Sequence, residues 1–201
     1  MDGVVIDSEK LYSTSEIGLL SNYGVKFDDS DWHYIKGCTE KQFYDLVYRK
    51  YSPDIDRDLL MSKGREFLKN VFTQKLEYMD GFIDIHSNLK NKFKLALVTS
   101  TGPELVNHIE SLLSIYSKFD LVITSLDTSR HKPFPDPYDK AMEKLNLKPH
   151  ECVIVEDSIQ GIKSGKNAGC AVIALEGSIE REYLKEADYI ISHLSEIQNI
   201  L

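Results

Sequence analysis

The chain has 201 residues, a formal net charge of -8 and 42% hydrophobic residues. This length suffices to bury a core as one domain, or as a core with an inserted second unit. The acidic balance argues against nucleic acid or an anionic membrane surface as the main partner. Three cysteines far apart in sequence, Cys38, Cys152 and Cys170, favour reduced thiols in a cytoplasmic protein over a disulfide framework. No apolar stretch approaches the ~18 residues of a membrane span, and the acid after Met1 argues against a leader peptide.

The first half of the chain, residues 8–91, shows helical spacing of apolar residues and no strand pattern. Ser8 is predicted to cap a helix that runs to Tyr23 and stops at Gly24, and Thr39 is predicted to cap the next helix. A third helix carries an apolar stripe formed by Leu60, Phe67, Leu68, Val71 and Phe72. These patterns predict a small helical unit.

After residue 91 the pattern changes to short apolar runs that alternate with helices. The predicted strands are Phe93–Val98, Leu121–Thr124, Cys152–Val155, Ala171–Leu175 and Tyr189–Ile191. Continuous apolar runs indicate strands that are buried on both faces, and alternation with helices is typical of parallel sheets. The second half of the chain therefore predicts an α/β fold with helices on both faces of a parallel sheet.

Polar side chains lie at or just beyond the ends of these runs. Thr99 and Ser100 follow one run, Lys132 comes after the next, and a third run leads into Glu156 and Asp157. Because chemistry in such sheets sits at the carboxyl ends of the strands, we expect these side chains to converge at one edge.

Together with Asp2, these residues suit the transfer of a phosphoryl group. Lys132 supplies a fixed positive charge, and Thr99 with the N–H groups of the following helix can bind phosphate oxygens. Asp157 is a hard oxygen ligand suited to Mg²⁺. Asp2 can give a proton to the leaving oxygen and then take one from the attacking water. Each residue alone has an ordinary structural explanation, so the order and spacing of the whole set carry the prediction.

Four segments, in order, resemble the four motifs of the haloacid dehalogenase (HAD) superfamily of hydrolases: Asp2–Glu9, Leu95–Thr101, Lys132–Tyr138 and Val153–Ile162. The branch that they resemble most is that of the β-phosphoglucomutase-like phosphatases, and the resemblance covers essentially the whole chain. It implies a Rossmann-like parallel-sheet core, residues 1–8 and 81–201, with an inserted helical cap domain, residues 9–80. The cap would close over the site, exclude water and choose the substrate.

The resemblance also implies roles for individual residues. Asp2 would be the acid and base, and its backbone carbonyl would contact Mg²⁺. Thr99 would bind the phosphate and Lys132 would orient it, while Asp157 would hold the metal with Glu156 supporting through water. Further substrate or phosphate contacts are expected from Ser100, Thr101, Lys36, Gly37 and Thr39.

The resemblance departs from the family pattern at the amino end. In the family a nucleophilic aspartate stands two residues before the acid/base, which is the position just before Met1. Asp7 does not substitute for it, because the family places that residue where the chain leaves for the cap. A central strand would also be missing, so the runs Leu95–Val98 and Cys152–Val155 would flank a gap. We therefore expect the natural protein to start upstream of Met1, and this chain by itself to lack the nucleophile and be inactive.

A second departure concerns the substrate. Glu40 occupies the place where the sugar mutase of the family has an arginine that grips a second phosphate, and an acid there repels phosphate. The resemblance, with this departure, predicts a Mg²⁺-dependent phosphatase of a small phosphorylated metabolite, such as a sugar phosphate. The enzyme would act through an aspartyl-phosphate and, by analogy with the family, as a monomer.

Three alternatives stay open. The chain could perform mutase-like phosphoryl transfer, or it could bind phosphate without chemistry. It could also cleave phosphonates, with Lys36 as the candidate for a Schiff base. His131 and Trp32 are predicted to be structural or solvated rather than functional.

Overall fold

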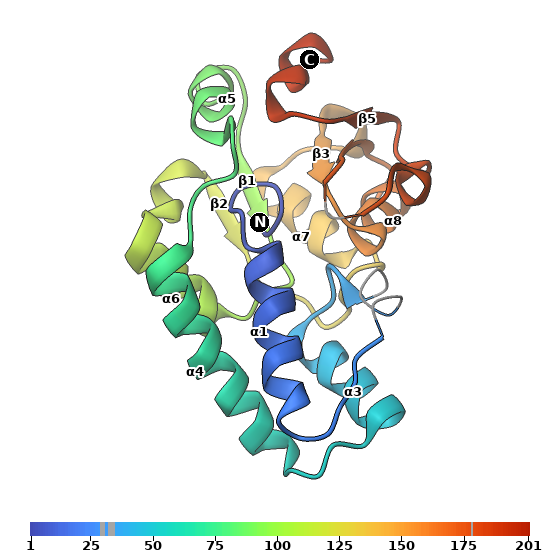
Figure 1. Cartoon of the computed structure of the whole chain (residues 1–201). Helices are drawn as coiled ribbons and strands as arrows, with labels where there is room; N and C mark the ends of the chain where they lie inside the picture. The colour runs from blue at the N-terminus through green and yellow to red at the C-terminus, as the bar shows by residue number, and fades with distance from the viewer. Residues whose placement is uncertain (29–30, 32–34, 178) are drawn as a thin grey trace.

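The computed structural model describes the whole chain except residues 29–30, 32–34 and 178. The molecule has a helical part and a part that contains all the described strands (Figure 1). The helical part consists of α1 (Glu9–Ser21), α3 (Glu40–Tyr51) and α4 (Arg57–Lys75). None of the helices in the described ranges combines the length and the apolar character needed to cross a bilayer.

The described strands run parallel, as predicted, and they form two sheets. One sheet pairs β1 (Ala96–Val98) with β2 (Leu121–Ile123). The other has the order β3-β4-β5 and contains Val153–Glu156, Ala171–Leu175 and Tyr189–Ile191. The predicted runs that contain β1 and β3 thus lie in different sheets.

Helices cover the strands. Helix α7 (Asp136–Leu145) packs against β1 and β2, and α8 (Ile159–Asn167) packs against β3 and β4. The remaining helical elements are α5 (Phe82–Leu89), α6 (Pro103–Leu113), η1 (Ile115–Lys118), η2 (Pro149–Glu151), η3 (Arg181–Leu184) and η4 (Leu194–Asn199). This alternation of strand and helix is the α/β pattern that the apolar runs predict.

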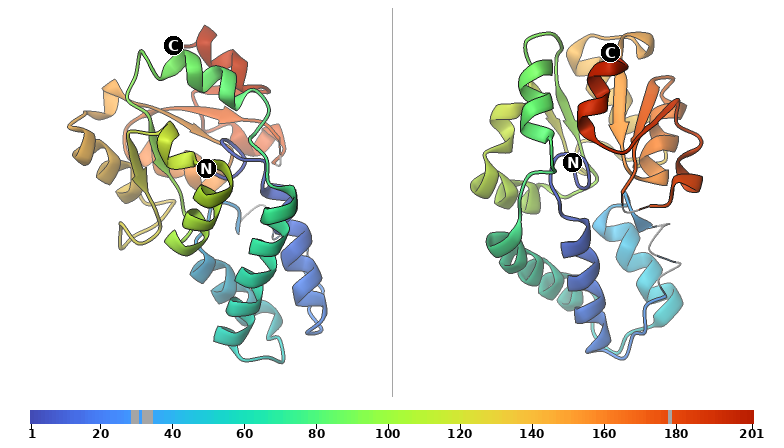
Figure 2. Two further views of the ribbon diagram at one scale, coloured as in Figure 1. Left: turned by 90° about the vertical axis from the view of Figure 1, so that its left-hand side faces the viewer. Right: turned by 45° about the horizontal axis from the view of Figure 1, so that its top comes forward.

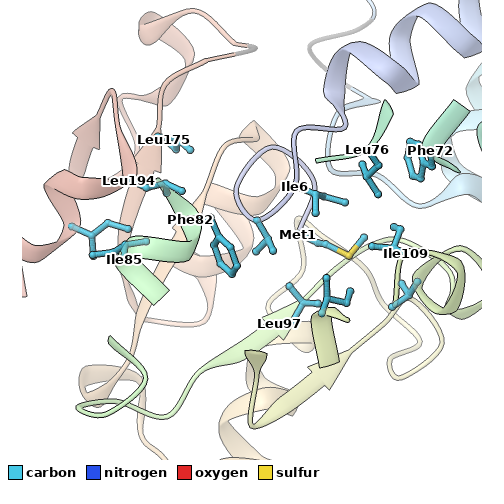
Figure 3. Packing of buried hydrophobic residues seen from close by; sticks show 14 of the residues in the cluster. Met1, Ile6, Phe72, Leu76, Phe82, Ile85, Leu97, Ile109, Leu175 and Leu194 are labelled. Carbon is cyan, nitrogen blue, oxygen red and sulfur yellow. The ribbon is translucent and has the colours of Figure 1, made fainter. Parts of the chain in front are cut away.

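One hydrophobic cluster joins the two sheets. Met1 and Ile6 are buried in the same cluster as Leu97 of β1 and Leu175 of β4 (Figure 3). The amino-terminal segment lies between the two groups of strands in the views of Figures 1 and 2. Packing of apolar side chains, rather than backbone pairing between β1 and β3, therefore connects the two sheets here.

The helical part has a cluster of its own, which includes Leu20, Phe43, Val47 and Leu60. The carboxyl-terminal half of α4 packs in the other cluster. Its buried residues Leu68 and Phe72, and Leu76 just after the helix, belong to the cluster that joins the sheets. Helix α4 thus packs on both parts of the molecule. The cap boundaries at residues 9 and 80 stay a prediction.

The structure corrects several local predictions. Ser8 precedes α1, but its hydroxyl makes no cap hydrogen bond. Helix α1 ends at Ser21, short of Tyr23, and Phe67 is exposed, because the buried stripe of α4 follows Leu60, Gly64, Leu68 and Phe72. The strand predicted from Phe93 begins at Ala96 and leaves Phe93 exposed. Thr39 does cap α3, in a reciprocal capping box with Gln42.

Candidate active site

A cavity of about 760 Å³ is lined by residues of both parts of the molecule. Every residue that the sequence predicts as catalytic, phosphate-binding or metal-binding lines it: Asp2, Lys36, Gly37, Thr39, Thr99, Ser100, Thr101, Lys132, Glu156 and Asp157. The edge of a parallel sheet and the inserted helices therefore share one cavity, which has the size of a small-molecule site.

Asp2 is held by the turn that opens the chain. The N–H groups of Val4, Val5 and Ile6 all donate to the Met1 carbonyl, at 3.3, 2.8 and 3.3 Å. The Asp2 carboxylate accepts hydrogen bonds from the hydroxyls of Ser8, at 2.8 Å, and Thr101, at 2.9 Å. Both of its oxygens are thus oriented, which suits a group that must transfer a proton at a fixed place.

The loop Thr99–Gly102 connects β1 to α6 and contains the predicted phosphate-binding residues. Thr99 is buried, and its hydroxyl oxygen accepts the Thr101 N–H at 3.1 Å. Gly102 has no side chain with which to cap the first turn of α6. Pro103 has no N–H, and the Leu105 N–H donates to the Gly102 carbonyl at 3.1 Å, so the Glu104 N–H is the group of this first turn that is left for an anionic ligand.

Lys132 is fixed by Glu156 and by the strand beside it. Its ammonium donates to a Glu156 carboxylate oxygen and to the Val98 carbonyl, and both charged side chains are buried. The other partners of Glu156 are the Tyr138 hydroxyl at 2.6 Å, the Ser158 hydroxyl at 3.0 Å and the Asp157 N–H at 3.2 Å. Burial by itself raises the pKa of Glu156, but the charges of Lys132 and of the Met1 ammonium, with the hydrogen bonds from Lys132 and Tyr138, bring the pKa down to about 2.

The four hydrogen bonds change the expectation for Glu156. Both of its oxygens already accept hydrogen bonds, two from Lys132 and Tyr138 and two from Ser158 and the Asp157 backbone. The side chain therefore positions Lys132 in this structure. The metal-supporting role through water stays a prediction.

Asp157 makes an ion pair across the cavity. Its Oδ2 accepts a hydrogen bond from the Lys36 ammonium at 2.7 Å, and Lys36 also lies 3.5 Å from Glu9 Oε2. Burial raises the pKa of Asp157, and Lys36 offsets only part of that increase. A Cβ on Gly3 would lie 1.9 Å from Asp157 Oδ2, so the carboxylate packs directly on the residue next to Asp2.

The pairing of Lys36 removes the support for phosphonate chemistry. Burial lowers the pKa of Lys36, but Asp157 and Glu9 outweigh burial and raise it above its ordinary value. A Schiff base needs a neutral amine. An ammonium paired with Asp157 at 2.7 Å does not provide one.

The loop before α3 takes part in the cavity through Gly37 and Thr39. The Ser100 hydroxyl donates to the Gly37 carbonyl at 2.6 Å, and Gly37 has a φ of +79°, which favours glycine. Thr39 is buried and bonded to Gln42, so it lines the cavity as a helix cap. The phosphate loop and the loop before α3 are therefore in direct contact.

Sequence patterns missed several residues of this cavity. Arg65 of α4 also lines it and forms an ion pair with Glu40, while Glu9, Tyr12 and Glu16 line it from α1. The only local signal was the helical spacing of Glu9, Tyr12 and Glu16, which puts them on one face of α1. Nothing in the sequence relates Arg65 to Glu40.

Of the residues predicted to be structural or solvated, His131 lines the cavity next to Lys132. Trp32 and His33 lie outside the residues that the structure describes, and their neighbour Asp31 accepts hydrogen bonds from Lys50 and Tyr51. Asp7 is exposed, and the cavity lining does not include it.

The geometry agrees with what comparison with known proteins finds. Residues 1–175 match the family model for haloacid dehalogenase-like hydrolases. The chain belongs to this family. The matched range contains all four motifs that line the cavity, so the ordered resemblance of these motifs is confirmed.

Relatives of this HAD-like chain include named phosphatases. It is 27% identical over 200 residues to the validoxylamine A 7'-phosphate phosphatase of Streptomyces hygroscopicus subsp. limoneus, covering 98% of this chain and 93% of that protein. It is 28% identical over 170 residues to a phosphorylated carbohydrates phosphatase of Thermotoga maritima, covering 84% and 79% of the two chains. The β-phosphoglucomutase of Clostridium difficile has the same fold, with a TM-score of 0.82, 20% identity, and coverage of 98% of this chain and 92% of that one.

Proposed function

We propose that this HAD-like hydrolase is a Mg²⁺-dependent phosphatase of a small phosphorylated metabolite of the sugar phosphate class. One observation carries the proposal: a single cavity brings together the Asp2 carboxyl, the loop Thr99–Gly102 and the Lys132 ammonium. The phosphatase relatives that act on phosphorylated carbohydrates support this substrate class. The half-exposed carboxylate of Glu40 supports a phosphatase over a mutase that must hold a second phosphate.

The described donors fit Mg²⁺ better than a transition metal. Among the described residues there is no group of three or more His, Cys, Asp or Glu placed to hold a metal. Mg²⁺ commonly uses only one or two carboxylates and completes its shell with water and substrate phosphate. Asp157, whose buried carboxylate packs against Gly3, would be one ligand, and the backbone carbonyl of Asp2 would be another. The ion would supply positive charge to the phosphoryl oxygens.

The residues of the chain divide the reaction among them. The phosphoryl group binds at Thr99 and the Glu104 N–H at the start of α6, and Lys132 donates a hydrogen bond to one of its oxygens. Asp2, oriented by Ser8 and Thr101, protonates the leaving oxygen and later removes a proton from the attacking water. Lys36 and Ser100 connect the helical part to the site and keep bulk water out. The resemblance assigns the nucleophilic carboxylate to the position immediately before Met1.

Phosphate release from a panel of sugar phosphates, with and without Mg²⁺, tests the proposal. The assay compares residues 1–201 with a version extended upstream through the expected aspartate. We expect turnover in the extended version, loss of turnover on chelation, and inhibition by beryllium fluoride. Asp2→Asn should abolish turnover and still bind phosphate. Phosphate binding without turnover in the extended version would favour the alternative of a non-catalytic binding protein.

A further inference from the structure

The helical part forms one side of the cavity, and we call it the helical wall: Glu16, Glu40, Tyr44 and Arg65. These residues come from α1, α3 and α4, whereas the phosphate loop and Lys132 come from the strand-containing part. A substrate whose phosphate binds at Thr99 would therefore direct the rest of the molecule toward the helical wall. The chemistry of this wall determines which remainder is accepted.

The guanidinium of Arg65 is occupied by Glu40. Arg65 Nε donates to both Glu40 oxygens, at 2.8 and 3.1 Å, and Arg65 Nη2 donates to Glu40 Oε2 at 2.7 Å. Nη1 lies 3.7 Å from Glu104 Oε2. A two-pronged arginine–carboxylate pair of this kind is among the stronger side-chain hydrogen-bonded pairs. The positive charge of Arg65 is thus compensated before any substrate arrives.

Within the part of the chain that the structure describes, the other lysine and arginine side chains that line the cavity each have a carboxylate within ion-pair distance. Lys36 pairs with Asp157 and Lys132 with Glu156. Lys41 and Arg57 share the single carboxylate of Asp45, and the Lys41 side chain is 77% exposed, so water solvates its charge. Lys132 and Lys36 lie on the side of the reacting phosphate and of the metal ligand. No cation of the helical wall in the described residues is left for a second anion.

Glu16 adds a neutral polar group to the wall. It has no hydrogen-bond or ion-pair partner among the described residues, and its side chain faces the cavity. Burial, with Glu9 and Glu40 adding to it, raises the pKa of Glu16 to about 8. A carboxyl that stays protonated at neutral pH both donates and accepts hydrogen bonds without carrying charge. Such a group matches a hydroxyl of a ligand.

We propose that the Glu40–Arg65 pair selects the part of the substrate that does not react. The helical wall accepts an uncharged, hydroxylated group and rejects a second phosphate. Arg65 could bind an anion, but its ion pair with Glu40 prevents this. The physical reason is desolvation: a phosphate dianion that enters the cavity without a free cation loses hydration that nothing replaces. This inference rests on the proposed function, because it assumes that the reacting phosphate binds at Thr99 and Lys132.

Binding calorimetry with Mg²⁺ present tests the pair without requiring turnover. The probes are fructose 6-phosphate and fructose 1,6-bisphosphate, which differ by one phosphate, and the measured quantity is the ratio of their Kd values. We expect the wild-type chain to prefer the monophosphate. Glu40→Gln should shift the ratio at least tenfold toward the bisphosphate, and the double variant Glu40→Gln/Arg65→Gln should lose that shift. Glu143→Gln, on the exposed Lys140–Glu143 pair, is the matched control that should leave the ratio unchanged.

The outcomes separate the pair from the function. An unchanged ratio in a folded Glu40→Gln variant, or a shift that survives removal of Arg65, overturns the role of the pair. The single variant Arg65→Gln is a second test. If Glu40 already occupies Arg65, its removal should leave the Kd of the bisphosphate within twofold of wild type, and a large loss of affinity would contradict this. If inorganic phosphate binds and neither sugar phosphate does, the proposal that the helical wall accepts a hydroxylated group is wrong, while the proposed phosphate site stands. Failure to bind inorganic phosphate refutes the proposed function itself.

Discussion

Replacing Glu156 by glutamine tests the claim that this carboxylate fixes Lys132. The substitution keeps the shape of the side chain and removes the carboxylate, whose pKa is lowered to about 2 from an ordinary 4.5, chiefly by the charge of Lys132. Each tenfold change in proton affinity is worth about 1.4 kcal/mol, so this lowering corresponds to about 3 kcal/mol of folding free energy at neutral pH. Removing one partner of a buried ion pair costs about 3–5 kcal/mol in other proteins, which agrees with this value.

Urea unfolding followed by circular dichroism measures the loss. At pH 7, Glu156→Gln should lower the free energy of unfolding by about 3 kcal/mol. Because the pKa of Glu156 is lower in the folded state, its contribution is complete above pH 4.5 and is lost as the pH falls toward 2. The difference between wild type and variant should therefore shrink on acidification.

Two controls make the result interpretable. Glu143→Gln breaks an exposed ion pair and should leave the free energy of unfolding unchanged within experimental error. The double variant Lys132→Met/Glu156→Gln should be less destabilised than the sum of its single variants, since it leaves no unpaired buried charge. A Glu156→Gln variant within about 1 kcal/mol of wild type at pH 7, or a difference that stays constant down to pH 3, would refute the reasoning.

Three further predictions follow from contacts at the cavity. Gly3→Ala should lower the free energy of unfolding by at least about 2 kcal/mol, because Gly3 has a φ of +68° and its new Cβ would meet Asp157, whereas Gly18→Ala within α1 should be neutral or stabilising in the same unfolding assay. As the pH rises from 5 to 8.5, the free energy of unfolding of Glu16→Gln should increase by about 2–4 kcal/mol relative to wild type. The reason is that burial raises the pKa of Glu16 to about 8, so that its ionisation above that pH opposes folding. Parallel stability curves of the two proteins would contradict this. Lys36→Met should bind Mg²⁺ several-fold more tightly in calorimetry, since the Lys36 ammonium occupies Asp157 Oδ2, and weaker binding would show that Lys36 does not compete with the metal.

The elements that carry the site could be predicted because their signals are local. Apolar runs place strands β1 and β3, and the polar residues that follow them must emerge at the same edge of a parallel arrangement. The capping box of Thr39 and Gln42 is likewise encoded within four residues. Such features depend on the conformational preference of a short segment of backbone. The order of the motifs along the chain then predicts that they share one site.

Errors arose where tertiary contacts override local preference. Ser8 has the position and chemistry of a helix cap, yet its hydroxyl bonds Asp2 because the opening turn brings that carboxylate within 2.8 Å. Phe67 fits an apolar stripe by spacing, but the buried face of α4 passes through Gly64, where the Tyr44 hydroxyl packs closely. In both cases a residue outside the helix, which the fold brings into contact with it, decides the outcome.

The charges of the cavity could not be predicted at all, because they depend on which residues meet across the helical part. Glu40, taken alone, predicts repulsion of phosphate, and the structure adds that Glu40 is half-exposed and forms an ion pair with Arg65. Lys36, predicted as a substrate contact, lines the cavity and forms an ion pair with Asp157. The effect of a charged residue on a ligand in the cavity therefore cannot be predicted until its ion-pair partner is known. An ion pair attracts a third charge far less than a free ion does.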